Sequence, residues 1–221
     1  MRISRLGRTA LLLLATSLLA SAGPAAASFI RSPISASIEL GGPGFGSIDD
    51  TLNQNGLSDS FTSGVTDFDD YLALTPLHDH EFFNREWFGE QDETTATVTY
   101  DLGALYLLDR LALWNEDGAG IEELSLFWST DGVSFSTLAL GLMPANNPSG
   151  VDYEAQVFSF SPTNTRFVRF VMSDCPQPGG TGFQACAIGE VAFSEGGSVP
   201  EPATLLLLGT GLLGFRRLRR R

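Results

Sequence analysis

The chain has 221 residues, and its 26 acidic residues outnumber its 13 basic ones, for a formal net charge of −13. A surface of this sign repels phosphate backbones, so the composition argues against a nucleic-acid-binding protein. The length leaves room for one domain with a sizeable core once terminal targeting segments are set aside.

The first 27 residues have the layout of a secretory signal peptide. Arg2, Arg5 and Arg8 precede an apolar stretch over residues 10–20, and three alanines at 25–27 supply a small-residue cleavage site. An uncleaved anchor helix is the alternative, but the short apolar stretch and its alanine-rich end favour cleavage after Ala27. We therefore expect export across the inner membrane.

The exported part is more acidic than the whole chain. Three arginines lie in the signal peptide and five in the last six residues, which leaves five arginines against 25 acidic residues and a net charge of −20. A surface of this charge attracts divalent cations. Solubility alone would also explain it, without any specific ligand.

Residues 28–95 show little periodicity. A strand is expected near 35–40, while the glycine-rich residues 41–44 and the acidic, asparagine-rich stretch 49–71 are typical of long loops. Such loops often carry binding residues. The cluster Asp67, Asp69 and Asp70 could supply oxygen ligands to a structural calcium ion, with Asp49 and Asp50 as alternatives.

Two further groups in this region have chemical interest. His78 and His80 would project to one face of an extended segment and, with Glu81, could bind zinc, although a solvated loop is the simpler interpretation. The aromatic residues that we consider for carbohydrate contact, or alternatively for the core, are Phe82, Phe83 and Trp87.

Strand patterns recur from residue 95 onward. Apolar and polar residues alternate over 95–102, and turn signals separate the later apolar segments. The further strands are expected at 105–114, 122–129, 134–140, 155–161, 166–172 and 188–193. Many short strands at near-regular spacing predict an all-β sandwich over residues 28–197. The two cysteines, Cys175 and Cys186, are expected to form a disulfide in an exported chain.

Five short motifs in this region resemble, in order, those of the discoidin family, also called F5/8 type C. They are residues 100–103, 108–111, 129–132 with Phe135, 166–170, and 190–191. The resemblance implies a galactose-binding-like jelly-roll β-sandwich, whose loops at one end bind carbohydrate, lipid or protein, often with a structural calcium ion. The loops between residues 34 and 87 match the family poorly, so no ligand-binding residue is carried over.

The last 24 residues, 198–221, combine a polar motif, an apolar run and an arginine cluster. The run at 203–215 would span roughly 20 Å as a helix, short of a hydrocarbon core of about 30 Å. With the motif Val199, Pro200, Glu201 and Pro202 in front of it, the segment resembles a PEP-CTERM sorting signal of Gram-negative bacteria. This resemblance implies a membrane helix at least transiently, recognition by an exosortase, and delivery to the cell surface or extracellular matrix.

No catalytic residue is assigned from the sequence. Carboxylates are so abundant that a pair suited to glycoside hydrolysis has no value as evidence, and no serine nucleophile motif is present. The sequence therefore favours an exported, non-catalytic binding module, with carbohydrate as the expected ligand class. A structural matrix protein without a specific ligand and a polysaccharide-active hydrolase are the alternatives.

Overall fold

The computed structural model describes residues 27–80, 84–180 and 183–196. The signal peptide and the C-terminal apolar helix expected from the sequence lie outside these residues, as do Glu81, Phe82 and Phe83. Within the described residues, β-strands predominate, and no helix is long and apolar enough to cross a membrane. The elements are β1 (Phe29–Arg31), β2 (Ser35–Leu40), the 3₁₀ helix η1 (Ile48–Leu52), α1 (Phe68–Leu72), β3 (Leu77–His78), β4 (Trp87–Phe88), β5 (Ala96–Asn115), β6 (Glu123–Ser129), β7 (Ser136–Leu142), β8 (Tyr153–Glu154), β9 (Gln156–Ser173) and β10 (Ala187–Glu195).

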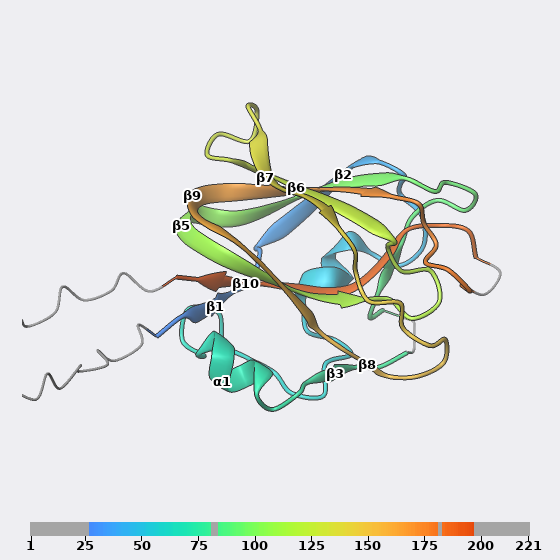
Figure 1. The fold of residues 1–221 in the computed structure, drawn as a ribbon, viewed down its shortest axis with the longest axis horizontal. Helices are drawn as coiled ribbons and strands as arrows, with labels where there is room; N and C mark the ends of the chain where they lie inside the picture. Colours follow the sequence, from blue (N-terminus) through green and yellow to red (C-terminus); the bar gives the residue numbers. More distant parts are fainter. Residues whose placement is uncertain (1–26, 81–83, 181–182, 197–221) are drawn as a thin grey trace, which may run out of the picture. The chain divides into compact units, whose positions relative to one another are not determined.

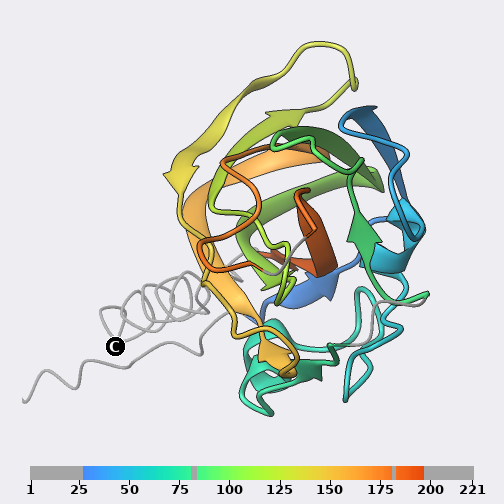
Figure 2. The ribbon, with the colours of Figure 1, turned by 90° about the vertical axis from the view of Figure 1, so that its right-hand side faces the viewer.

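Two long antiparallel strands, β5 and β9, organise the fold (Figure 1). The first half of β5 lies between β2 and the last part of β9. On its other side this part of β9 pairs with β6, and β6 in turn pairs with β7. The second half of β5 pairs with β10, and β10 pairs with β1 and β4. Each long strand therefore belongs to both layers of a β-sandwich, and Figure 2 shows the strands curving around the core.

The change of layer along β5 has a local cause. The pairing of β5 with β9 shifts register between Asp101 and Tyr106. Gly103 lies in this interval with a φ of +81°, a conformation that glycine adopts without the strain of a side chain. Its N–H donates to Asp101 Oδ1 over 2.7 Å, which holds the bend.

The sequence-based expectation of an all-β sandwich is confirmed, with one refinement. The segments 95–102 and 105–114 were predicted as separate strands but form the single strand β5, and 155–161 and 166–172 together form β9. The alternation in the first half of β5 marks its buried face correctly, because Ala96, Val98 and Tyr100 are at most 1% exposed. Between the layers they pack with Leu111, Phe170 and Phe193 among others.

A second apolar core covers the outer face of the β5–β10 layer. Ala112 and Trp114 of β5 and Ala192 of β10 point away from the first core, and they pack with side chains from the irregular N-terminal part. Those side chains include Ile30, Phe61, Phe68 and Tyr71. The stretch 49–71, expected as loops, thus carries η1 and α1 and shields one face of the sandwich. This explains the continuous apolar runs in the second half of β5 and in β10, which are buried on both faces.

Helix caps fix the two short helices of this cover. Ser47 Oγ accepts from Asp49 N, and the Asp50 side chain accepts from Ser47 N, which together form a capping box at η1. Asp67 caps α1 by accepting from the backbone N–H groups of Asp69 and Asp70.

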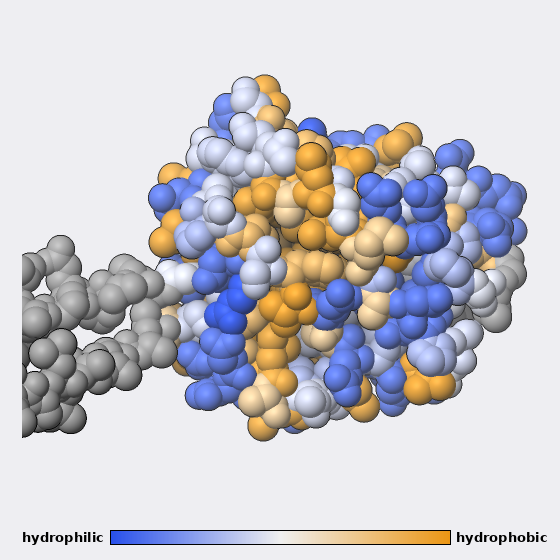
Figure 3. Space-filling model, viewed as in Figure 1, coloured by the Kyte–Doolittle hydropathy of each residue, from blue (hydrophilic) through white to orange (hydrophobic). Residues whose placement is uncertain are grey.

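The face of the domain in Figure 3 carries a band of apolar surface bordered by polar residues.

Candidate functional site

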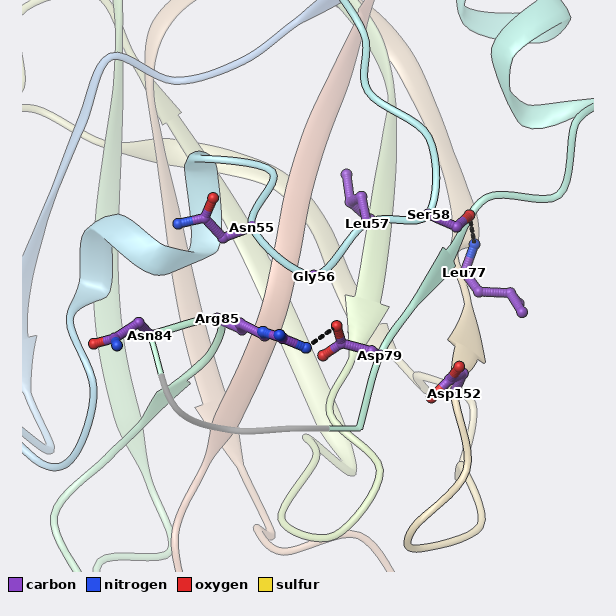
Figure 4. Close-up of a pocket in the computed structure, with 9 residues that line it drawn as sticks. All are labelled: Asn55, Gly56, Leu57, Ser58, Leu77, Asp79, Asn84, Arg85 and Asp152. Atoms are coloured by element: carbon purple, nitrogen blue, oxygen red, sulfur yellow. Dashed lines mark hydrogen bonds and ion pairs between the residues drawn. The ribbon is translucent and has the colours of Figure 1, made fainter.

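A cavity of about 570 Å³ opens where four segments of the domain meet (Figure 4). It is lined by Asn55, Gly56, Leu57, Ser58, Leu77, Asp79, Asn84, Arg85 and Asp152. These residues come from the loop after η1, from β3 and the residue after it, from the segment before β4, and from the residue before β8. The site is therefore built mainly by the part of the chain that showed least periodicity in sequence.

Backbone hydrogen bonds dock the loop after η1 onto β3. Ser58 N donates to Leu77 O over 2.8 Å, and Asp79 N donates to Gly56 O over 2.9 Å. Ser58 Oγ also accepts from Leu77 N at 3.0 Å. At the start of the loop, Gln54 N donates to Glu190 Oε2 of β10 over 2.7 Å, so this wall of the cavity is tied to the central sheet.

Gly56 is required where the loop passes the His78 ring. Its φ is +114°, and a Cβ at this position would lie 2.7 Å from His78 Nε2. A side chain would therefore meet both backbone strain and a buried ring. Glycine lets the loop approach β3 closely enough for the cavity wall to form.

Charged pairs lie in the wall and at the rim of the cavity. Arg85 Nη1 donates to Asp79 Oδ2, and the two side chains are 41% and 27% exposed. His80 Nδ1 lies 2.7 Å from Asp152 Oδ1, and this contact lowers the pKa of Asp152. The cavity thus presents fixed donors and acceptors at its surface, and Leu57 and Leu77 are also among its lining residues.

A set of buried polar side chains lies behind this cavity. His78 is fully buried, stacks on Tyr153 with ring centroids 5.2 Å apart, and donates from Nδ1 to Asp79 O over 2.8 Å. Burial lowers its pKa, so the ring is neutral. Tyr153 Oη donates to Glu86 Oε1 over 2.5 Å, and desolvation raises the pKa of Glu86 to about 8. Sequence patterns gave no sign of Glu86 or Tyr153, because these residues meet only through the tertiary fold.

The two histidines have different environments. His78 is in the interior and His80 is at the surface with Asp152. The solvated-loop interpretation therefore holds for His80 and is wrong for His78. Of the two interpretations considered for Trp87, the core is confirmed, because Trp87 is fully buried and donates from Nε1 to Pro43 O.

The acidic stretch at 67–70 has structural partners. Asp67 caps α1, and Asp69 accepts from Arg110 Nη1 at 2.5 Å and from Ser28 Oγ at 3.2 Å. The hydrogen bond from Arg110 lowers the pKa of Asp69. Calcium binding by Asp67, Asp69 and Asp70 stays a prediction. The predicted disulfide is confirmed, since Cys175 and Cys186 are bonded and both are buried.

Comparison with known proteins identifies the C-terminal segment. Residues 198–221 match the model of the PEP-CTERM protein-sorting motif. The match includes Val199, Pro200, Glu201 and Pro202, which lie outside the described residues. The chain therefore carries the signal of an exported protein that is sorted to the cell envelope through an exosortase. No curated protein sequence matches the chain.

Several solved structures have similar folds at low identity. A module of Clostridium perfringens, CpGH89CBM32-5, solved in complex with GalNAc-β-1,3-galactose, is 15% identical with a TM-score of 0.48, and the alignment covers 72% of this chain and 93% of that one. The CBM32 of AlyQ, in complex with 4,5-unsaturated mannuronic acid, is 14% identical with a TM-score of 0.43, over 74% and 96% of the chains. Chitosan-binding module 1 of a Paenibacillus sp. IK-5 chitosanase/glucanase is 13% identical with a TM-score of 0.46, over 72% and 92%.

Proposed function

We propose that the domain is a non-catalytic module that binds carbohydrate in the cavity of Figure 4, at the outer surface or in the extracellular matrix of a Gram-negative bacterium. The observation that carries this proposal is the make-up of the cavity wall. The ion pair of Arg85 with Asp79 and the exposed side chains of Asn55 and Asn84 offer both donors and acceptors, and Leu57 and Leu77 are the apolar residues of the lining. Sugars present hydroxyl groups and apolar C–H faces together, which this combination suits.

Delivery to that surface follows from the two ends of the chain. The C-terminal segment brings the chain to an exosortase, and the membrane is a transient partner in this step. Export exposes the acidic domain to the polysaccharides of the envelope, which are the ligands that we propose.

The carboxylates near the cavity do not suit glycoside hydrolysis. Glu86 is fully buried, so a glycosidic bond has no access to it. Asp152 is at the surface, but His80 lowers its pKa, and a general acid needs a raised one. Asp79 is engaged by Arg85. These observations favour binding over turnover.

A glycan array probed with the full-length chain, followed by calorimetric titration of the hits, tests the proposal. Asn84→Ala and Asn55→Ala each remove one hydrogen-bonding side chain, worth about 1 kcal/mol, and should weaken binding about fivefold. Asn164→Ala is the matched control, since Asn164 is exposed in β9 and does not line the cavity. Absence of any bound glycan would favour a structural matrix protein, and release of products from a polysaccharide would favour a hydrolase.

A further inference from the structure

Three carboxylates converge in the interior between β4 and the end of β5. Glu86 immediately precedes β4, and Glu116 and Asp117 immediately follow β5. One oxygen from each lies within 4.8 Å of the others. The residues are 0%, 4% and 4% exposed, so three acidic groups share a space from which water is nearly excluded.

No arginine in the described part of the chain neutralises this group. Arg31, Arg85, Arg110, Arg166 and Arg169 are the five arginines of the described residues, and each is paired with a carboxylate elsewhere. The chain contains no lysine. His78 Nδ1 lies 3.5 Å from Glu86 Oε1, but this nitrogen donates its hydrogen bond to Asp79 O. Burying several carboxylates without a compensating positive charge is strongly unfavourable.

Neutral donors hold one oxygen of each carboxylate in place. Tyr153 Oη donates to Glu86 Oε1, Gly118 N donates to Glu116 Oε2 over 2.8 Å, and Gly150 N donates to Asp117 Oδ2 over 2.5 Å. Within the described residues, the buried atoms Glu86 Oε2 and Asp117 Oδ1 have no hydrogen-bond partner. Donors that orient carboxylates while leaving other oxygens unpaired are characteristic of the surroundings of metal ligands.

We propose that Glu86, Glu116 and Asp117 form a binding site for a hard divalent cation of the calcium class. The donors are all oxygen, and ligand atoms on opposite sides of a calcium ion lie up to about 5 Å apart, which accommodates the observed spacing. The cation supplies the positive charge that the protein part of the site lacks. It joins the segment before β4, which carries Asn84 and Arg85 of the cavity wall, to the loop after β5.

The competing occupant of this site is the proton. Without a cation, desolvation raises the pKa of Glu116 to about 9, and the neighbouring Glu86 adds to this rise. A proton on Glu116 would remove its charge without any metal, and it would give a protein that does not respond to calcium. The two possibilities therefore differ in a measurable way.

The test uses the full-length chain in detergent, stripped with EDTA and then titrated with calcium or magnesium chloride. We expect calorimetric binding of calcium and a rise in the unfolding temperature at millimolar calcium. Glu116→Gln and Asp117→Asn should each weaken calcium binding at least tenfold and remove most of the thermal shift. Glu116→Gln should be at least as stable as the wild type without calcium, because glutamine keeps the size of the side chain and places no charge in the buried group.

Glu93→Gln is the matched control, since it neutralises an exposed carboxylate that belongs neither to this site nor to the acidic stretch at 67–70. It should bind calcium like the wild type. Loss of binding in Asp70→Asn with retention in Glu116→Gln would overturn the proposal and move the ion to α1. A wild type that neither binds calcium nor gains stability would assign the cluster to protons. The sugar titration is a separate measurement, so failure of the cation site is distinguishable from failure of carbohydrate binding.

Discussion

Arg166 of β9 forms a bidentate salt bridge with Asp101 of β5. Nε donates to Oδ1 and Nη2 donates to Oδ2, each over 2.8 Å. The pair lies beside Gly103, whose N–H also donates to Asp101. Hydrogen bonds from Arg166 hold the pKa of Asp101 below its ordinary value of 3.8. One carboxylate therefore links the neighbouring strand and the bend at which β5 changes layer.

This pair predicts a pH dependence of stability. A lowered pKa in the folded state means that the carboxylate stabilises the fold above pH 3.8, and that this contribution is lost as the pH falls through the folded pKa. Asp101→Asn should be less stable than the wild type at pH 7, and the difference should disappear in strong acid. Thermal unfolding of both proteins across this range measures it. A gap that is independent of pH would mean that the charge of Asp101 contributes nothing.

The approach of Gly56 to His78 predicts a steric effect on the cavity. Gly56→Ala places a methyl group against a buried ring at a φ of +114°, and it should cost about 1–3 kcal/mol of stability and weaken glycan binding. The control is Gly141→Ala, whose φ is +62° and whose Cβ would have no neighbour within 4 Å. It should cost about 1 kcal/mol and leave binding unchanged. Denaturant unfolding and sugar titration separate the two effects, and equal behaviour of the two variants would contradict this account.

The second core predicts that the N-terminal cover is part of the folding unit. Phe68 is 1% exposed, whereas Val65 nearby is 68% exposed. Phe68→Ala should lower the free energy of unfolding by about 3–5 kcal/mol, while Val65→Ala should change it by less than about 0.5 kcal/mol. A small effect of Phe68→Ala would show that α1 can detach from the sheet without unfolding the domain.

The disulfide predicts a redox-dependent stability. Replacing Cys175 and Cys186 by serine should destabilise the domain by about 3 kcal/mol, because the bond closes a loop between residues 11 apart in sequence. Reduction of the wild type should lower its unfolding temperature toward that of the double variant. The double variant itself should not respond to the reductant, because it contains no cysteine, and a response would mean that the reductant destabilises the domain without breaking a disulfide.

The sorting signal predicts the ends of the mature protein. Mass spectrometry of the protein from its native host should give an N-terminus at Ser28 and a C-terminus near Pro200, within the segment that matches the sorting motif. Recovery of a chain that retains Arg221 would mean a lasting membrane anchor instead of removal by an exosortase.

The predictability of this fold from sequence differs between its two parts. Strands after residue 95 were predictable because alternation directly reports a half-buried strand, as in Ala96, Val98 and Tyr100. The strand expected near 35–40 is confirmed as β2, but the cover formed by residues 48–72 was not predictable, since Phe61 and Phe68 contact Trp114 only across long sequence separation. The sequence left Trp87 open between the core and a ligand contact for the same reason, because β4 is only two residues long and has no readable period.

The candidate site was harder to predict from the sequence than the fold. His78 and Asp79 could be singled out by residue type, but their roles depend on Tyr153 and Arg85, which no spacing rule connects to them. The proximity of Glu86 to Glu116 could not be predicted from the sequence, for a different reason. In a chain with 26 acidic residues, a sequence pattern cannot distinguish two buried glutamates from exposed ones.

The continuity of β5 and β9 through both layers has a consequence for how the domain opens. A sandwich made of two separate sheets can separate along the plane between them. Here β5 and β9 stay paired with each other by backbone hydrogen bonds in both layers. The amides of these two strands should therefore exchange their hydrogens with solvent as one cooperative group, and only through global unfolding. Force or protease that reaches one layer must disrupt the other as well, so we expect the domain to resist both in an all-or-none manner.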